Sequence, residues 1–310
     1  MPPGPAAGGQ RAGMAMIDPL PGDIFRKGQV LNNTYEIEGV LGRGGTGEVY
    51  RARNQITGRV VAVKALNREF SHNDAYLELM KREEEMRNIQ HEAVVRYTDC
   101  SRTAEGHVYL VMDHVDGTPL ADWMERSVQP RDLLVVAHRV AEGLVATHGR
   151  NIVHRDLSPD NIILRGDDPA EAVIIDFGIA KDSSAGARTI VGSDFAGKYE
   201  YAAPEQMHGR AEPRSDLYSL GASLLAVYRG RVPEVGRSPG EVLRRKEEPL
   251  DTSGVPEPLK GLIDTLTQPD PARRPPSAAA AVAEIGELLR PKAAAAARPR
   301  RRRWWLVAAP

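Results

Sequence analysis

One stretch of this sequence limits the possible folds more than any other. It reads His154-Arg155-Asp156-Leu157-Ser158-Pro159-Asp160-Asn161, and Asp176-Phe177-Gly178 follows. A carboxylate, an amide and a second carboxylate in this order suit phosphoryl transfer from a nucleoside triphosphate, because that reaction depends on positioned reactants and neutralised charge. We predict that Asp156 accepts the proton of an attacking hydroxyl, and that Asn161 and Asp176 hold the Mg²⁺ ions that bridge the phosphates.

Composition allows a two-lobed globular protein and argues against several other classes. The chain has 310 residues, 41% of them hydrophobic, and a formal net charge of −1, so no global positive charge points to nucleic acid. Its single cysteine, Cys100, excludes an internal disulfide and suits a reducing compartment. Residues 1–10 lack the basic start and apolar core of a signal peptide.

The sequence divides into an arm, a strand-rich region and a helical region. Residues 1–30 are rich in Pro, Gly and Ala, and we expect a flexible arm there. Short β-branched runs between 31 and 116 predict a small antiparallel β lobe with one main helix, over about 75–89. Residues 117–290 predict a larger helical lobe with long helices at 133–148 and 215–228. The predicted fold class is therefore α+β, with two lobes.

The C-terminal tail combines features of a segment that enters a membrane. Residues 291–303 include a run of arginines, and residues 304–310 read Trp-Trp-Leu-Val-Ala-Ala-Pro. A basic cluster followed by aromatic and apolar residues is typical of the cytoplasmic end of a spanning helix. Because a helix needs about 20 residues to span, we expect 304–310 to be the start of a transmembrane helix, with the chain on the cytoplasmic face. The alternative is a basic tail that ends in an apolar peptide.

A glycine-rich segment in the β region suits phosphate binding. Residues 42–49 fit the pattern G-x-G-x-x-G-x-V through Gly42, Gly44, Gly47 and Val49. Glycine lets backbone N–H groups approach phosphates without a Cβ in the way. A predicted strand follows instead of a helix, which argues against a dinucleotide-binding turn. The next predicted strand brings Lys64, whose ammonium can meet the α and β phosphates.

These motifs, in this order and over residues 35 to about 290, resemble those of the eukaryotic-like (Hanks-type) serine/threonine protein kinases of bacteria. The resemblance implies ATP and Mg²⁺ as cofactors, with Mn²⁺ as an alternative, and transfer of the γ-phosphoryl group to Ser or Thr hydroxyls of proteins. It also implies a nucleotide pocket with Val49 and Ala62 as its roof, Ile163 as its floor and Met112 at its back. The other residues expected around ATP are Leu41, Gly42, Gly44, Gly47, Lys64, Glu83 and the backbone of Asp113 and Val115.

The sequence leaves the acidic partner of Lys64 open. In such kinases the helix of the small lobe supplies a glutamate, but counting along this chain places Arg82 at the expected position. A helix one residue shorter would bring Glu83 there, with Met86 on the same face. We predict Glu83 as the partner and keep Glu85 as the second choice.

The same resemblance implies structural roles around the catalytic loop. His154 should pack and hydrogen-bond near Phe177 instead of acting as a base. Asp216 should anchor the backbone of the loop from a buried helix. Glu205, which ends the Ala-Pro-Glu motif at 203–205, should form an ion pair with Arg274.

Regulation by autophosphorylation is a further implication of the resemblance. The activation segment runs from Asp176 to Glu205. Arg155, next to the predicted catalytic aspartate, offers a bidentate site for a phosphate on this segment. Thr189 and Ser193 are the candidate phosphosites, and a second copy of the chain is a candidate partner in trans.

Two positions depart from the family pattern. Ser158 stands where these kinases normally carry a lysine that helps to neutralise the γ-phosphate, and Lys198 stands where they carry a threonine. The changes can compensate, because Lys198 would bring the cation to Asp156 from the opposite side while Ser158 supplies the hydroxyl. The alternative is that Lys198 lies on the surface and the enzyme is slower.

We therefore predict a serine/threonine protein kinase in bacterial signalling, of the single-pass, membrane-anchored receptor type. The main alternative is a nucleotide-binding pseudokinase that acts as a scaffold, which only Ser158 and the uncertain glutamate favour. A small-molecule kinase is disfavoured because the Ala-Pro-Glu and Asp-Phe-Gly motifs are both present. The expected partners are protein substrates and, through the tail, the membrane; no nucleic acid is expected.

Overall fold

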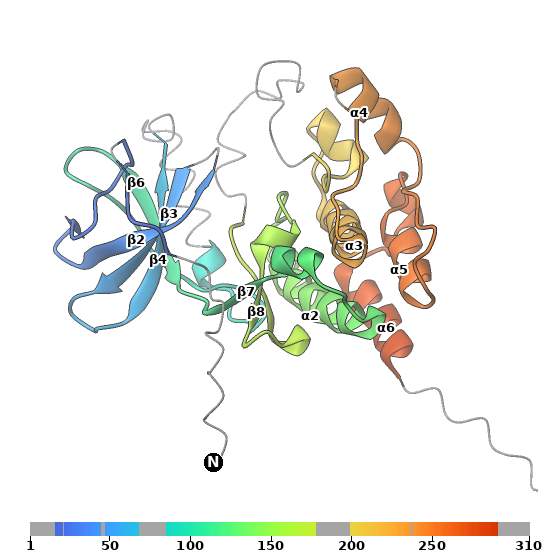
Figure 1. The fold of residues 1–310 in the computed structure, drawn as a ribbon, viewed down its shortest axis with the longest axis horizontal. Coiled ribbons are helices and arrows are strands. Elements are labelled where there is room, and N and C mark those ends of the chain that lie inside the picture. Colours follow the sequence, from blue (N-terminus) through green and yellow to red (C-terminus); the bar gives the residue numbers. More distant parts are fainter. Residues whose placement is uncertain are drawn as a thin grey trace, which may run out of the picture.

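The computed structural model describes residues 16–20, 22–44, 47–67, 85–177, 199–236 and 238–290. Most strands gather in a small lobe, and the long helices build a larger one (Figure 1). The chain passes between the lobes after β6 (Val108–Asp113) and enters the larger lobe at β7 (Gly117–Pro119). This arrangement confirms the predicted α+β fold class.

An antiparallel sheet forms the small lobe, with the strand order β1-β2-β3-β4-β6-β5. Besides β6, its strands are β1 (Val30–Leu31), β2 (Tyr35–Gly44), β3 (Gly47–Asn54), β4 (Val60–Leu66) and β5 (Tyr97–Arg102). Successive side chains of β4 alternate between two apolar clusters, as a strand requires. Ala62 and Leu66 belong to the cluster shared with the large lobe, and Val61, Val63 and Ala65 belong to the one confined to the small lobe.

The helix expected over about 75–89 is described only at its end. Residues 85–87 form a helical turn, after which the chain continues to β5, and residues 75–84 lie outside the described part of the chain. Met86 and Ile89 are buried in the shared cluster. The inward position of Met86 agrees with the face expected for it.

The expectation of a flexible arm over residues 1–30 needs correction from Met16 onward. Ile17 and Val40 exchange backbone hydrogen bonds of 2.9 and 2.8 Å, which adds the arm to the edge of β2. Phe25 is fully buried in the small-lobe cluster, with its ring centroid 5.5 Å from that of Tyr50. The Pro- and Gly-rich composition concealed this contact, because a single buried aromatic residue is enough to anchor such a segment.

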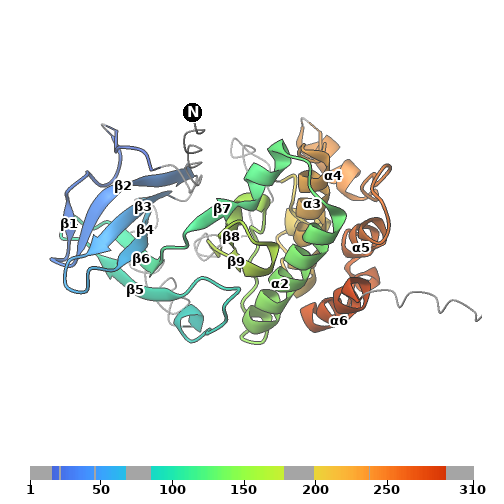
Figure 2. The same ribbon diagram turned by 60° about the horizontal axis from the view of Figure 1, so that its bottom comes forward.

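The large lobe begins with a three-stranded sheet in the order β7-β8-β9, with β8 at Ile162–Arg165 and β9 at Ala172–Ile174. Figure 2 places this small sheet between the strands of the small lobe and helix α2. The chain 93–95 runs beside β9, since Ile174 donates to the carbonyl of Ala93 and accepts from the N–H of Val95, at 2.8 and 2.9 Å. The lobes are therefore joined by backbone hydrogen bonds as well as by packing.

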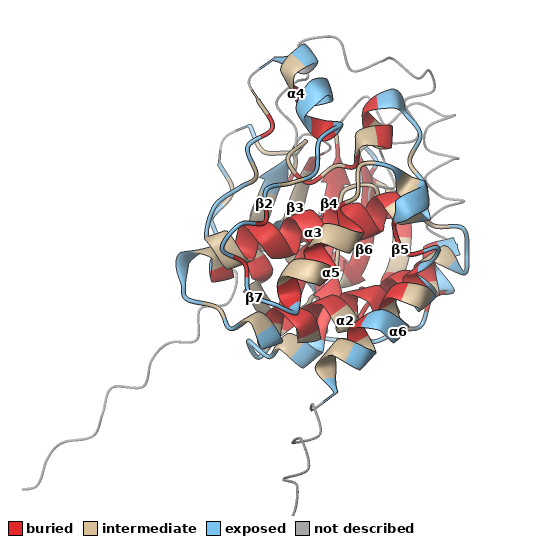
Figure 3. Ribbon diagram, turned by 90° about the vertical axis from the view of Figure 1, so that its right-hand side faces the viewer, coloured by how far each residue is buried: buried red, intermediate tan, exposed pale blue. Residues whose placement is uncertain are grey.

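Five α-helices are described in the large lobe: α2 (Pro130–His148), α3 (Pro213–Arg229), α4 (Pro239–Lys246), α5 (Leu259–Leu266) and α6 (Ala278–Leu289). The helices expected at 133–148 and 215–228 correspond to α2 and α3. Residues 215–227 of α3 are all buried, which makes this helix the centre of the lobe (Figure 3). Among the residues that the structure describes, no helix has the length and apolar character needed to cross a membrane.

Candidate active site

The catalytic loop lies between α2 and β8 and is held by a buried carboxylate from α3. Asp216 is fully buried. Its Oδ2 accepts from the backbone N–H of His154 at 2.8 Å, and its Oδ1 accepts from that of Arg155 at 2.9 Å. His148, at the end of α2, lies 2.8 Å from the same carboxylate through Nε2. Asp216 thus fixes the loop backbone, in the place that the sequence predicted for it.

Arg155 has a left-handed backbone conformation, which residues other than glycine rarely adopt. Its φ is +67°, a region that costs a non-glycine residue on the order of 1–3 kcal/mol unless the surroundings impose it. Asp216 holds the N–H of Arg155, and Gln206 donates from Nε2 to its carbonyl at 2.9 Å. The role of Gln206 was missed from the sequence.

His154 links the catalytic loop to the segment before Asp176. Burial lowers the pKa of His154 below its usual range, which leaves the ring neutral. Nδ1 accepts from the N–H of Asp156 at 3.2 Å, and Nε2 donates to the carbonyl of Ile175 at 3.0 Å. The ring centroid lies 4.6 Å from that of Phe177. Both ring nitrogens are engaged, so the imidazole holds structure and offers no base.

The three residues expected around the metal and the acceptor hydroxyl lie on adjoining segments. Asn161 sits in the short 3₁₀ helix η3 (Pro159–Asn161), and its Nδ2 donates to the carbonyl of Asp156 at 2.7 Å. The N–H of Ile175 donates to the carbonyl of Asn161 at 2.9 Å, which brings Asp176 beside the catalytic loop. Asp176 itself has a φ of +54°. A strained backbone at this position is typical of a functional site.

Lys64 reaches this group from β4. Its side chain is 8% exposed and forms an ion pair with Asp176. The predicted partner Glu83 lies outside the described residues, and the second choice, Glu85, is exposed. In this conformation the carboxylate that neutralises the buried ammonium is therefore the one that the sequence assigned to the metal.

Most side chains expected around the nucleotide base form one apolar group. Ala62 and Met112 are buried members of the shared cluster, and Leu41, Val49 and Val115 pack against it. Asp113 ends β6, beside Met112. Ile163 is 1% exposed on β8 and lies outside this cluster, although its Cγ2 is only 2.9 Å from where a Cβ on Gly117 would stand. The roof and back of the predicted pocket are thus brought together, with Ile163 on the neighbouring small sheet.

The glycine-rich turn joins β2 and β3, whose pairing extends as far as Gly44 and Gly47. Gly42 lies opposite Val49 and Gly44 opposite Gly47, while residues 45 and 46 lie outside the described part. At Gly47 the φ is +148°, and an added Cβ would stand 1.9 Å from the carbonyl oxygen of Ala65. Only glycine fits there, so Gly47 is required by the close approach of β4.

The N-terminal segment holds this turn by an ion pair that the sequence did not reveal. Arg43 donates from Nε and Nη2 to the two carboxylate oxygens of Asp23, at 2.9 and 2.6 Å. The Arg43 guanidinium lowers the pKa of Asp23 to about 2. Asp23 therefore remains charged throughout the physiological range and tethers a residue of the predicted phosphate-binding turn.

The donor set fits a magnesium–nucleotide complex. Asn161 uses its amide nitrogen to hold the loop, which leaves the amide oxygen as the group that faces a cation, and Asp176 supplies a carboxylate. No cluster of three or more His, Cys, Asp or Glu side chains suited to a metal occurs among the described residues. Mg²⁺ does not need one, because it is usually bound through one or two protein groups, substrate phosphates and water.

Four residues that the sequence analysis named between Asp176 and Glu205 lie outside the described residues: Gly178, Thr189, Ser193 and Lys198. Their predicted roles in the activation segment stay predictions. Ser158, the other position that departs from the family pattern, is fully buried and precedes the turn that carries Asn161.

Comparison with known proteins places this geometry in a family. The family model for the protein kinase domain matches residues 35–284. Serine/threonine-protein kinase pkn2 of Myxococcus xanthus is 34% identical over 266 residues, which cover 80% of this chain and 32% of that protein. Serine/threonine-protein kinase PknB of Mycobacterium tuberculosis is 31% identical over 265 residues, covering 82% of this chain and 42% of that protein. The chain belongs to the protein kinase family and has its bacterial relatives among Hanks-type serine/threonine kinases.

Solved structures agree on the fold. The kinase domain of Mycobacterium tuberculosis PknI superposes with a TM-score of 0.61 at 22% identity, over 85% of this chain and 99% of that one. Rad53 residues 1–466, in complex with AMP-PNP, gives a TM-score of 0.68 at 24% identity, over 80% of this chain and 64% of that one. The chain spans only about a third to two fifths of the length of pkn2 and PknB, at 32% and 42%.

Proposed function

We propose that this chain transfers the γ-phosphoryl group of ATP to Ser or Thr hydroxyls of proteins, with Mg²⁺ as the metal and Mn²⁺ as a substitute. The observation that carries the proposal is the meeting of Asp156, Asn161, Asp176 and Lys64 from three separate segments. Such a group can position reactants and neutralise charge, which is what phosphoryl transfer requires.

Each of these residues has a separate task in the proposed reaction. Asp156 orients the acceptor hydroxyl and takes its proton as the bond to phosphorus forms. Asn161 and Asp176 would hold the metal, which supplies charge neutralisation on the phosphates when bound. Lys64 would bind phosphate oxygens, and its present pairing with Asp176 holds its ammonium at the site.

The direct test is phosphate incorporation from labelled ATP into the purified chain and into a basic protein acceptor. We expect incorporation with Mg²⁺ or Mn²⁺, its loss with a chelator, and sites at Ser or Thr by mass spectrometry. ATP binding without any incorporation would contradict the proposal and favour the pseudokinase scaffold. Ser158 would then be the first residue to examine.

Regulation and location form a second part of the proposal. We infer autophosphorylation in trans at Thr189 or Ser193, read by Arg155, which stands beside the catalytic aspartate. The basic and apolar sequence of 291–310 supports attachment to the cytoplasmic face of a membrane as a receptor-type kinase. Mass spectrometry of the chain after incubation with ATP tests the first inference. Fractionation of cells that express the natural full-length protein tests the second.

The departures from the family pattern at Ser158 and Lys198 lead to a measurable expectation. If Lys198 supplies the cation beside the γ-phosphate, Lys198→Met should lower kcat by roughly 30- to 1000-fold, equivalent to about 2–4 kcal/mol of barrier. Lys181→Met, which removes the same charge from the same segment, serves as the control and should keep its activity. A Lys198→Met protein as active as the parent would show that this cation has no part in the reaction.

A further inference from the structure

Lys246 ends α4 and is the most deeply buried lysine among the described residues, with 1% of its surface exposed. Lysine is almost never buried to this degree unless it is paired. Burial lowers the pKa of Lys246 to about 7, because removal from water penalises the ammonium, although the charges of Glu200 and Glu205 oppose the shift. Interactions of the Lys246 ammonium must therefore offset the cost of its burial.

The contacts of Lys246 show what it holds. Its Nζ donates to the backbone carbonyl of Glu200 at 2.9 Å and to that of Ala202 at 2.7 Å. It also lies 5.1 Å from the centre of the Tyr218 ring, which favours a cation over its face. The two carbonyls belong to a turn closed by the N–H of Ala202 and the carbonyl of Tyr199, at 3.2 Å. One ammonium therefore fixes the turn at residues 199–202, which we call the 199–202 turn.

The 199–202 turn lies between α4 and the catalytic loop. Tyr201 is 6% exposed and packs in one cluster with Tyr218 of α3. Asp160 of the catalytic loop is near enough to contribute to the raised pKa of Tyr201, whose main cause is burial. Directly after the turn, Ala203 precedes η6 (Pro204–His208), whose Gln206 donates from Nε2 to the carbonyl of Arg155. A shift of this turn would thus be felt beside Asp156.

We propose that Lys246 is a positioning residue for the protein acceptor, because it holds the 199–202 turn beside the catalytic loop. The inference rests on the proposed function, because it takes the 199–202 turn, beside the catalytic loop, to form part of the surface that receives the protein acceptor. An apolar residue in place of Lys246 would avoid the cost of burying a charge. It would also leave the carbonyls of Glu200 and Ala202 without their donor, and the turn could then relax.

The buried ammonium has its own consequence for stability. Because the folded pKa of about 7 lies below the usual value of 10.5, the unfolded chain binds more protons between these values, and folding becomes more favourable as the pH rises through this window. Relative to Lys246→Met, the wild type should therefore gain thermal stability from pH 7 to pH 9. The charged groups around Nζ are Glu200, Glu205 and, across Tyr218, Arg274. An equal difference at both pH values would show that Lys246 is not buried in solution.

The test compares Lys246→Met with Arg244→Met, which removes an exposed cation from the same helix. Steady-state kinetics are measured separately against ATP and against an unphosphorylated protein acceptor whose phosphorylation site has been mapped. We expect the KM for the acceptor to rise about tenfold in Lys246→Met, the size of one lost charge-assisted hydrogen bond. The KM for ATP and the kcat at saturating acceptor should stay within about twofold, and Arg244→Met should match the wild type.

The outcomes separate this inference from the proposed function. A wild type that incorporates no phosphate refutes the proposed function, whatever Lys246 does. An active wild type with an unchanged acceptor KM in Lys246→Met overturns the positioning role, as does an equal loss against ATP and acceptor. If circular dichroism shows that the methionine variant does not fold, Lys246→Gln replaces it, because the amide keeps one donor for the turn. A rise in the KM for the acceptor without a rise in the KM for ATP then supports the positioning role, and equal changes in both overturn it.

Discussion

Asp156→Asn is expected to lower phosphoryl transfer by on the order of 10²- to 10⁴-fold while the protein stays folded and binds ATP. The amide has the shape of the carboxylate but accepts no proton from the attacking hydroxyl, and a positioned base contributes about this much. The N–H of Asp156 would still donate to Nδ1 of His154, and its carbonyl would still accept from Asn161. The loss should therefore be one of chemistry, visible in single-turnover rates with ATP affinity measured alongside.

A matched control exists on the turn after β8. Asp167 has a φ of +63° and an ion pair with Arg126 at the surface, where its side chain is 43% exposed. Asparagine tolerates this backbone conformation, so Asp167→Asn makes the same chemical change away from the catalytic loop and should keep full activity. Equal incorporation by Asp156→Asn and the wild type would remove Asp156 from the role of base.

The catalytic loop was predictable because its functional residues lie close together in the sequence. His154, Asp156 and Asn161 lie within eight positions of one another. The side chains of His154 and Asn161 hydrogen-bond to the backbone of Asp156, and His154 also bonds to the carbonyl of Ile175. Local spacing therefore fixes much of the geometry. The role that the family resemblance implied for Asp216 is also found, since its buried carboxylate accepts from two backbone N–H groups of the loop.

Contacts that depend on a distant segment were not predictable from spacing. The pairing of Lys64 with Asp176 joins β4 to a residue 112 positions away. Phe25 anchors an arm whose average composition predicted no structure. Lys246 follows two arginines and precedes two glutamates, a run that indicates a solvated face. Which of these residues points inward depends on where α4 begins, because each residue turns a helix by about 100°.

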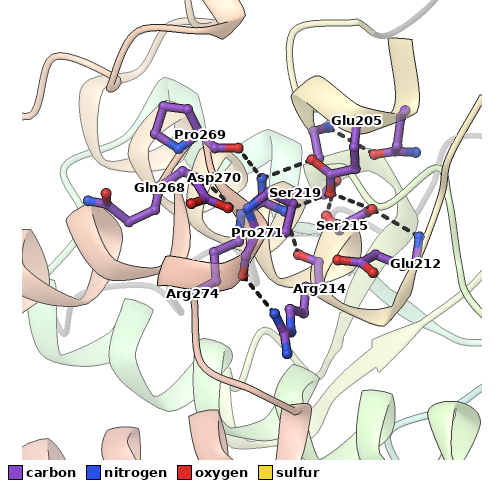
Figure 4. Close-up of polar contacts among 12 residues, drawn as sticks. Glu205, Glu212, Arg214, Ser215, Ser219, Gln268, Pro269, Asp270, Pro271 and Arg274 are labelled. Atoms are coloured by element: carbon purple, nitrogen blue, oxygen red, sulfur yellow. Dashed lines mark hydrogen bonds and ion pairs between the residues drawn. The ribbon is translucent and has the colours of Figure 1, made fainter. Parts of the chain in front are cut away.

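The predicted ion pair between Glu205 and Arg274 is buried, and it is part of a larger group of hydrogen bonds. Arg274 donates from Nη1 and Nη2 to the two oxygens of Glu205, at 2.7 and 2.9 Å (Figure 4). Ser215, at the start of α3, donates to the same carboxylate at 2.6 Å. Burial alone would raise the pKa of Glu205, but the hydrogen bonds from Arg274 and Ser215 outweigh it and hold the pKa below its usual range.

Arg274 does more than neutralise Glu205. Its guanidinium also donates to the backbone carbonyls of Gln268, Arg214 and Pro269, at 2.7, 3.0 and 3.0 Å (Figure 4). Its side chain has no exposed surface, against 10% for that of Glu205. One side chain therefore joins the chain before α6 to the start of α3 and to Glu205 of the Ala-Pro-Glu motif.

Arg274→Met is consequently expected to destabilise the protein by about 3–5 kcal/mol, the usual effect of leaving one member of a buried ion pair without its partner. Glu205→Gln should cost less, because Arg274 keeps its three carbonyls and the amide oxygen can still accept from it. Denaturant unfolding of both variants measures the difference, with Arg273→Met, exposed and adjacent, as the control. Since the folded pKa of Glu205 lies below the unfolded one, the deficit of Arg274→Met should shrink as the pH falls below about 4.5. Equal losses in the two variants would mean that Arg274 acts only through Glu205, and that the three carbonyl contacts contribute nothing to the stability of the lobe.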